Sequence, residues 1–398
     1  MRNVLVLLLL FFPALAPDRQ LTLARDMVEE AVIRGDEEQL QLARERLVRI
    51  ASETSDRTVM RDANYLAALA ALFESNSPYR DRLTAARAGA SGTHLIDRAL
   101  ELDPKFADAW AVSAMLGRRN DLAKAIELDP KSTPAAFFAA FMKSFNPNGG
   151  APPEGVKAFD DLAARLDADR AATGRAFGLW DAEAHAWQIF VRIASDEPDA
   201  ATMRPMVARL LEQRPDFALA RMLGEAVAER RFVEAPAMTW QPFLTDAAGD
   251  GKNPKLPDIV AVDKAESGDR IWYRVTFHDP LPRSFGVNVV INRSGDPATG
   301  SRWWGKDSTA RFDRLITAWI THDGDRYFGR VGVTDDDGAR GARMTKLSSD
   351  VQLAMTERSG MLGVPREVLG LTEKSSVIVA GGSPLVWNDD ATSAANSR

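Results

Sequence analysis

The chain reads His94-Leu-Ile-Asp-Arg-Ala99-Leu-Glu-Leu-Asp-Pro104 in one segment and Lys124-Ala125-Ile-Glu-Leu-Asp-Pro130 in another, so the phrase Ala-hydrophobic-Glu-Leu-Asp-Pro occurs twice. Each copy follows a stretch with apolar residues on one helical face. Proline cannot continue a helix, and it disfavours helical backbone in the residue before it. The repeated unit therefore predicts a helix, a turn marked by proline, and a second helix.

The same helical period extends outward from these two phrases over residues 18–233. Apolar residues recur at three- and four-residue spacing with charged residues between them, as at Leu40, Leu47 and Ile50, which is typical of amphipathic helices. Besides the repeated unit, we expect helices over 21–33, 37–51, 64–73, 155–169, 180–195, 200–213 and 218–231.

The repeated phrase resembles the tetratricopeptide repeat. Ala99 and Ala125 stand at the small position before each proline, and Trp110 stands where the next repeat has its early aromatic residue. Pro104 and Pro130 are 26 residues apart, whereas the repeat period is about 34. The resemblance implies a degenerate, irregular array of helical hairpins. Such arrays form concave faces, and the implied partner is a protein or peptide.

The second half has a different period. Residues 234–257 are rich in Pro, Gly and Asp, which predicts a linker. Within 258–391 apolar residues alternate, so that Ile271, Tyr273, Val275 and Phe277 lie on one side of a strand. Short strands with Gly and Asp turns predict an antiparallel β-sandwich of jelly-roll type. We therefore expect a multidomain α+β chain, with a disordered tail over 392–398.

Three phrases, at 292–305, 310–319 and 385–390, resemble the β-sandwich of family-nine carbohydrate-binding modules and the wider DOMON-like group. The resemblance implies sugar binding between aromatic rings, often beside a structural calcium ion. On this basis Trp303, Trp304 and Trp387 form a stacking platform, and Asn388 and Asp296 bind sugar hydroxyls. The alternative for any single Trp is a place in the core.

Oxygen-bearing side chains alternate at Asn292, Ser294 and Asp296, as they do in a calcium-binding loop. The later bidentate Glu of such a loop is missing. We favour a polar turn held by side-chain hydrogen bonds at this place. The predicted cofactor content is therefore none, with a structural calcium ion as the alternative.

The N-terminal residues 1–16 combine a basic start, an unbroken apolar run and a small-x-small site at Ala14 and Ala16. This pattern predicts a secretory signal peptide, and hence export to the periplasm or the extracellular space. Pro17 directly after the site is unfavourable for cleavage. The alternative is an N-terminal anchor in contact with the membrane.

Composition narrows the possible activities. The net charge of −6 argues against nucleic acid as a partner, and the absence of cysteine excludes disulfides, thiol nucleophiles and cysteine-based metal sites. The known motifs of nucleophilic, metal-dependent and nucleotide-dependent enzymes are missing. We therefore predict a non-catalytic exported binding or scaffold protein. The alternatives are a polysaccharide-active enzyme with an accessory module and a structural envelope component.

Overall fold

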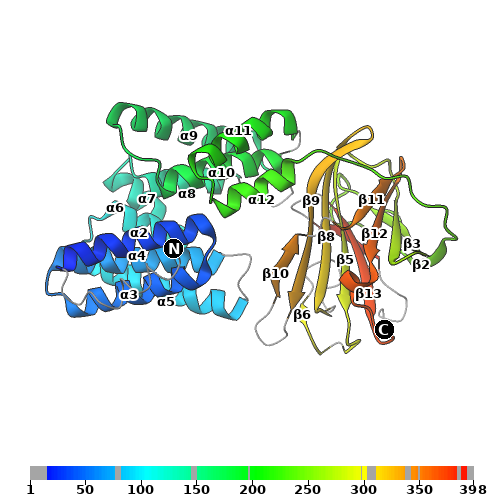
Figure 1. Cartoon of the computed structure of the whole chain (residues 1–398), viewed down its shortest axis with the longest axis horizontal. Coiled ribbons are helices and arrows are strands. Elements are labelled where there is room, and N and C mark those ends of the chain that lie inside the picture. The colour runs from blue at the N-terminus through cyan, green and yellow to red at the C-terminus, as the bar shows by residue number, and fades with distance from the viewer. Residues whose placement is uncertain are drawn as a thin grey trace.

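The computed structural model describes residues 16–76, 82–144, 150–195, 198–296, 298–302, 311–336, 342–347, 350–382 and 387–391. Figure 1 shows a helical first half beside a second half built of sheets. The predicted α+β architecture is confirmed. The signal-peptide or anchor segment, apart from Ala16, and the predicted tail over 392–398 lie outside the described residues.

Successive helices of the first half pack against each other, and Figure 1 shows α2–α5 as one bundle that α6 and α7 connect to α8–α12. Pro17 opens the first described helix at a position where its missing N–H costs nothing. The described helices of this half are α2 (Pro17–Arg34), α3 (Glu37–Glu53), α4 (Arg57–Asn76), α5 (Arg82–Leu102), α6 (Ala107–Met115), α7 (Asp121–Leu128), α8 (Thr133–Ser144), α9 (Pro153–Thr173), α10 (Leu179–Ile193), α11 (Ala200–Gln213) and α12 (Ala218–Val227).

Both copies of the repeated phrase end a helix in the same way. The Oδ1 atom of Asp103 accepts the backbone N–H of Lys105 at 3.0 Å, and Oδ1 of Asp129 accepts that of Lys131 at 2.9 Å. Helix α5 ends one residue before the first Asp, and α7 ends one residue before the second. Ala99 and Ala125 are fully buried, so small side chains stand where neighbouring helices approach closely.

Helix α12 is shorter than the sequence predicts. It ends at Val227, whereas the apolar period predicts a helix to residue 231. Arg230 and Arg231 instead form the short strand β1 (Arg230–Arg231), which pairs with β9 (Arg326–Asp336). The Arg230 guanidinium also donates to the carbonyl of Gly329 at 3.0 Å. Pairing with β9 gives the backbone N–H and C=O groups of residues 230–231 the hydrogen bonds that a longer α12 would have given them. The contact with the sheet therefore overrides the helical preference of this segment.

The second half contains two principal antiparallel sheets. One has the order β1-β9-β8-β5-β13-β14, with β10 also on β9, and the other has the order β11-β12-β4-β3-β2. A small sheet joins β6 to β7, and α13 (Arg366–Leu369) is a single helical turn after β12. The remaining strands are β2 (Gln241–Thr245), β3 (Ile259–Ser267), β4 (Arg270–Phe277), β5 (Ser284–Asn292), β6 (Ser301–Arg302), β7 (Arg311–Phe312), β8 (Arg314–Asp323), β10 (Ala342–Leu347), β11 (Gln352–Met355), β12 (Ser359–Pro365), β13 (Ser376–Gly382) and β14 (Trp387–Ala391).

Alternating residues of the central strands form the core between the two sheets. The residues of β4 expected on one side (Ile271, Tyr273, Val275, Phe277) belong to one buried cluster, together with Val287, Val289 and Ile291 of β5. The segment 234–257, expected to be a linker, contributes β2 to the edge of the five-stranded sheet. Its backbone therefore belongs in part to the sandwich.

The two halves meet where α12 packs against β9. Phe328 of β9 is buried in the core cluster of the helical half. Phe190 and Met222 of the helices and Trp319 of β8 line a narrow apolar gap at the same place. Apolar side chains from both halves therefore share one contact region.

Gly329 lies at this junction, and a substitution there tests how closely the two halves pack. Its φ is +149°, and an added Cβ would lie 1.8 Å from the Trp319 carbonyl oxygen. We expect Gly329→Ala to lower the free energy of unfolding by about 3 kcal/mol, because both the backbone and β8 would have to move. Urea denaturation followed by circular dichroism measures this change.

Gly89→Ala in α5 is the matched control, since the nearest atom to its added Cβ is the Ser75 Cβ at 3.6 Å. We expect this variant to be more stable by about 0.5–1 kcal/mol, because alanine restricts the unfolded chain. Equal stability of Gly329→Ala and the unchanged protein would contradict the described junction.

Candidate functional site

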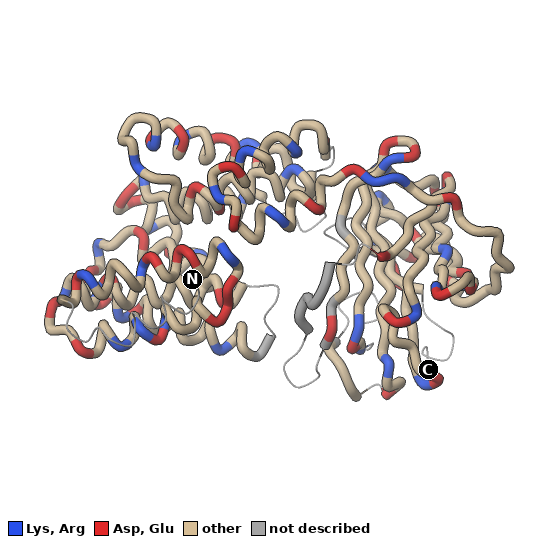
Figure 2. The backbone as a smooth tube through the Cα atoms, viewed as in Figure 1, with Lys and Arg blue, Asp and Glu red and all other residues tan. Residues whose placement is uncertain are grey.

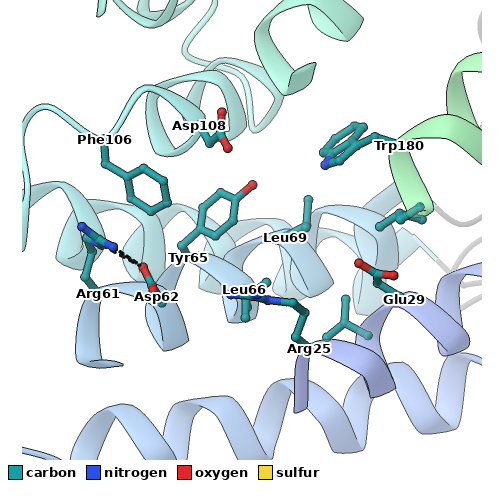
Figure 3. Close-up of a pocket in the computed structure, with 12 residues that line it drawn as sticks. Arg25, Glu29, Arg61, Asp62, Tyr65, Leu66, Leu69, Phe106, Asp108 and Trp180 are labelled. Carbon is teal, nitrogen blue, oxygen red and sulfur yellow. Dashed lines mark hydrogen bonds and ion pairs between the residues drawn. The ribbon is translucent and has the colours of Figure 1, made fainter. Parts of the chain in front are cut away.

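A cavity of about 360 Å³ opens between α2, α4, α6 and α10 in the helical half (Figure 3). The four helices come from segments far apart in the sequence. Aromatic, acidic and basic side chains surround an aliphatic floor. The lining residues are Arg25, Val28, Glu29, Arg61, Asp62, Tyr65, Leu66, Leu69, Phe106, Asp108, Leu179 and Trp180.

Three aromatic side chains from different elements border the cavity. Tyr65 comes from α4, Phe106 directly precedes α6, and Trp180 lies in the first turn of α10. The rings of Tyr65 and Phe106 are 4.9 Å apart at 52°. Phe106 reaches this place because α5 ends at Leu102, four residues earlier, and the Asp103-Pro104 turn redirects the chain. Figure 3 shows Trp180 across the cavity from Phe106, which leaves space between the aromatic groups.

Two half-buried carboxylates of the cavity lack an ion pair within the described part of the chain. Asp108 accepts a hydrogen bond from the Ser132 hydroxyl at 2.6 Å, and no cation pairs with it. Burial raises the pKa of Asp108, and the charge of Asp129 adds to this rise. Burial also raises the pKa of Glu29, with a contribution from Asp26 that Arg25 opposes. Arg214 opposes the rise at Glu29 as well. Neither carboxylate forms an ion pair with a described residue, so both carry partly desolvated negative charge.

The two arginines of the cavity differ in their contacts. Arg61 forms ion pairs with Asp62 at 2.7 Å and Asp103 at 2.9 Å, and its guanidinium lies 4.8 Å from the centre of the Phe106 ring. Arg25 is exposed and forms no ion pair with any described residue. Figure 2 shows both signs of charge interspersed along the helices of this half. The unpaired acids are therefore a property of the cavity, not of a broadly acidic surface.

The predicted sugar site is only partly within the described residues. Trp303 and Trp304 lie outside them, and Trp387 is described by its backbone in β14 alone. Asn388 is buried, and its side-chain amide binds the neighbouring loop. It donates to the carbonyls of Leu256 and Pro257 at 3.3 and 3.1 Å and accepts the N–H of Asn253 at 2.6 Å. These bonds hold the Asn388 amide against the neighbouring loop.

Asp296 lies at the opposite end of the sheet from Trp387 and Asn388. Trp387 is aligned with Gly382 and, through it, with Gly286 at the start of β5. Asp296 follows the far end of the same strand. Six strand residues separate these rows, which is roughly 20 Å. The prediction therefore grouped Asp296 with Trp387 and Asn388, which the fold places far apart. Short sequence phrases do not reveal how neighbouring strands are aligned.

The 292–296 segment is a hydrogen-bonded turn, as favoured above. Oδ1 of Asn292 accepts the Ser294 hydroxyl at 2.8 Å and the N–H of Gly295 at 3.0 Å. The Ser294 hydroxyl in turn accepts the N–H of Asp296 at 3.1 Å. The oxygens of this segment bind its own backbone, as in other Asx turns.

A different set of carboxylates fits the calcium ion that the resemblance implies. Oxygens of Asp246, Asp250 and Asp389 lie within 4.8 Å of one another, and Asp389 is fully buried. One oxygen of Asp389 accepts the N–H of Ile259 at 2.8 Å. An all-carboxylate set matches the preference of calcium for oxygen ligands, and these residues would hold the ion. No sequence pattern marks this set, because Asp246 and Asp250 lie in the expected linker and Asp389 is far away in the chain.

Comparison with known proteins adds no relative. No protein-family model matches the chain, and a search of curated proteins finds no significant match. The tetratricopeptide and carbohydrate-module resemblances therefore stay predictions. None of the helices in the described ranges combines the length and the apolar character that a membrane span needs.

Helix α10 also carries a buried acid, Glu183, one turn after Trp180. Burial raises the pKa of Glu183 to about 7, an effect that the nearby Trp187 indole partly offsets. A carboxyl group with a raised pKa in the folded state stabilises the protein most below its unfolded pKa, and this contribution is lost as the pH rises through the folded pKa. The relevant window is therefore between about pH 4.5 and 7.

We expect Glu183→Gln to match the unchanged protein in stability at pH 4.5 and to exceed it by ~3 kcal/mol above pH 7.5. Denaturation curves at several pH values measure this difference. Glu212→Gln, at an exposed position of α11, is the control and should leave the free energy of unfolding nearly unchanged. A constant difference between Glu183→Gln and the unchanged protein at all pH values would refute the raised pKa.

Proposed function

We propose that this chain is a non-catalytic binding protein whose helical half takes a segment of a protein or peptide partner into the cavity between α2, α4, α6 and α10. The convergence of Tyr65, Phe106 and Trp180 on one space supports this proposal most directly. Aromatic side chains supply large contact areas at small entropic cost, and they dominate the affinity of many interfaces.

The size of the cavity favours one anchoring group over a large cofactor. At about 360 Å³ it is near the lower limit of ligand pockets, which hold roughly 300–1,000 Å³. This volume suits a single long side chain together with some adjacent backbone. The rest of a bound segment would lie along the helices around the opening.

The cavity wall is held in place before any partner binds. The Asp103-Pro104 turn fixes the start of α6, and the Arg61–Asp103 ion pair connects this turn to α4. Trp180 packs against Phe137 with ring centres 5.4 Å apart. Groups that are already ordered lose less entropy on binding, which favours affinity.

Carbohydrate binding by the β-sandwich stays a separate proposal from the sequence, centred on Trp303, Trp304 and Trp387. Export through the N-terminal segment likewise rests on the sequence pattern alone. Neither proposal is needed for the function assigned to the helical cavity.

The test uses peptides selected from a random displayed library on the full chain, with dissociation constants measured by fluorescence polarisation. We expect Trp180→Leu to weaken their binding by about 30-fold, the loss typical of an interface hot spot of roughly 2 kcal/mol. Leu42→Ala, at an exposed position of α3, is the control and should leave binding unchanged. Melting curves verify that both variants are folded. Failure to select any peptide, or binding that is indifferent to Trp180→Leu, would refute the proposal.

A further inference from the structure

We infer that the group held in the cavity is a cation, namely a lysine or arginine side chain of the partner segment. This inference rests on the proposed function, because it names what the same cavity binds. It is carried by the arrangement of Glu29, Asp108 and the aromatic rings around one space.

The charges around the cavity are unbalanced toward the negative. Arg61 is engaged by two carboxylates, Asp62 and Asp103, so it has no charge left to neutralise others. Of the remaining lining groups, Glu29 and Asp108 are acidic and only Arg25 is basic. Asp129 adds negative potential at Asp108, where no basic side chain opposes it. At Glu29 the negative potential of Asp26 and Glu30 is opposed by Arg25 and by Arg214, which does not line the cavity. A bound cation would supply the missing counter-charge.

Burial increases the stabilisation that a bound cation would give to the two carboxylates. The pKa of each carboxyl group is raised chiefly by desolvation, which means that the protein gives the ionised form less stabilisation than water does. An ammonium or guanidinium group between the two carboxylates would restore this stabilisation. Charge-assisted hydrogen bonds to such groups are about twice as strong as neutral ones.

The aromatic wall suits the same kind of ligand. Cations are attracted to the faces of Trp, Tyr and Phe rings when they lie within about 6 Å of the ring centre. The cavity already contains one example, because the Arg61 guanidinium lies 4.8 Å from the centre of Phe106. Trp180 and Tyr65 present two further aromatic groups to the space between them (Figure 3).

Arg25 is the lining residue whose charge would repel a bound cation. The direction in which its removal changes the affinity therefore tests the charge of the ligand. It is exposed and in the same helix as Glu29, four residues earlier. An anionic ligand would be drawn to Arg25, but Arg61 is already occupied and the nearby acids would repel it. A cationic ligand should therefore bind more tightly when the charge of Arg25 is removed.

The experiment compares three versions of a selected peptide that differ only at the anchoring position, which carries Lys, Met or Glu. We expect the Met version to bind the full chain about tenfold more weakly than the Lys version, and the Glu version more weakly still. Rising salt concentration should weaken binding of the Lys version more than that of the Met version.

Protein variants then locate the charges. Glu29→Gln and Asp108→Asn should each weaken binding of the Lys version by about tenfold and leave the Met version nearly unchanged. Arg25→Gln should tighten binding of the Lys version several-fold. Glu212→Gln, an exposed acid on α11, is the control and should change neither.

The outcomes separate this inference from the proposed function. If the Met or Glu version binds as tightly as the Lys version, or if Arg25→Gln weakens binding, the ligand is not a cation. The proposed function would still hold in that case as long as Trp180→Leu weakens binding as expected above. If no peptide binds at all, both fail together.

Discussion

The structure of the helical half depends on one local constraint, a proline that ends a helix directly after an aspartate. A proline inside a helix costs about 3 kcal/mol, so α5 cannot continue beyond this point. The Asp103 side chain binds the N–H of Lys105 and so fixes the direction in which the chain leaves. Phe106 and Asp108 follow within five residues and become part of the cavity wall. The turn that breaks the helix thus also supplies two of the groups that we assign to binding.

A proline turn also follows α11 at Pro215, although there the proline comes after Arg214 and not after an aspartate. After Pro104 the indole of Trp110 donates to the proline carbonyl at 2.9 Å, and after Pro215 the guanidinium of Arg221 donates to the equivalent carbonyl at 2.7 Å. In both cases the donor is six residues beyond the proline. A side chain one turn into the next helix therefore secures these two corners. The corners are alike although the spacing between them is irregular, so hairpins of unequal length create a cavity at one place and close packing elsewhere.

The charged side chains of the helical half fall into two kinds, those that form ion pairs and buried carboxylates that do not. Arg61, Asp62 and Asp103 neutralise one another across a turn, and Arg44 pairs with the buried Glu74 at 2.9 Å. Glu29, Asp108 and Glu183 are desolvated and form no ion pair with a described residue. Desolvated carboxylates without an ion pair lower the stability of the folded state. Proteins commonly keep such destabilising groups at functional sites. Two of the three, Glu29 and Asp108, line the cavity to which we propose that a partner binds.

The sequence by itself determined the elements whose causes are local. Pro104 and Pro130 end helices through their own covalent geometry, and the alternation at Ile271, Tyr273, Val275 and Phe277 specifies which side of a strand is buried. Only the tertiary structure decided the rest, because it depends on register and on long-range contact. Pairing with β9 ends α12 early, strand register separates Asp296 from Asn388, and Glu29, Tyr65, Asp108 and Trp180 meet although no local pattern connects them.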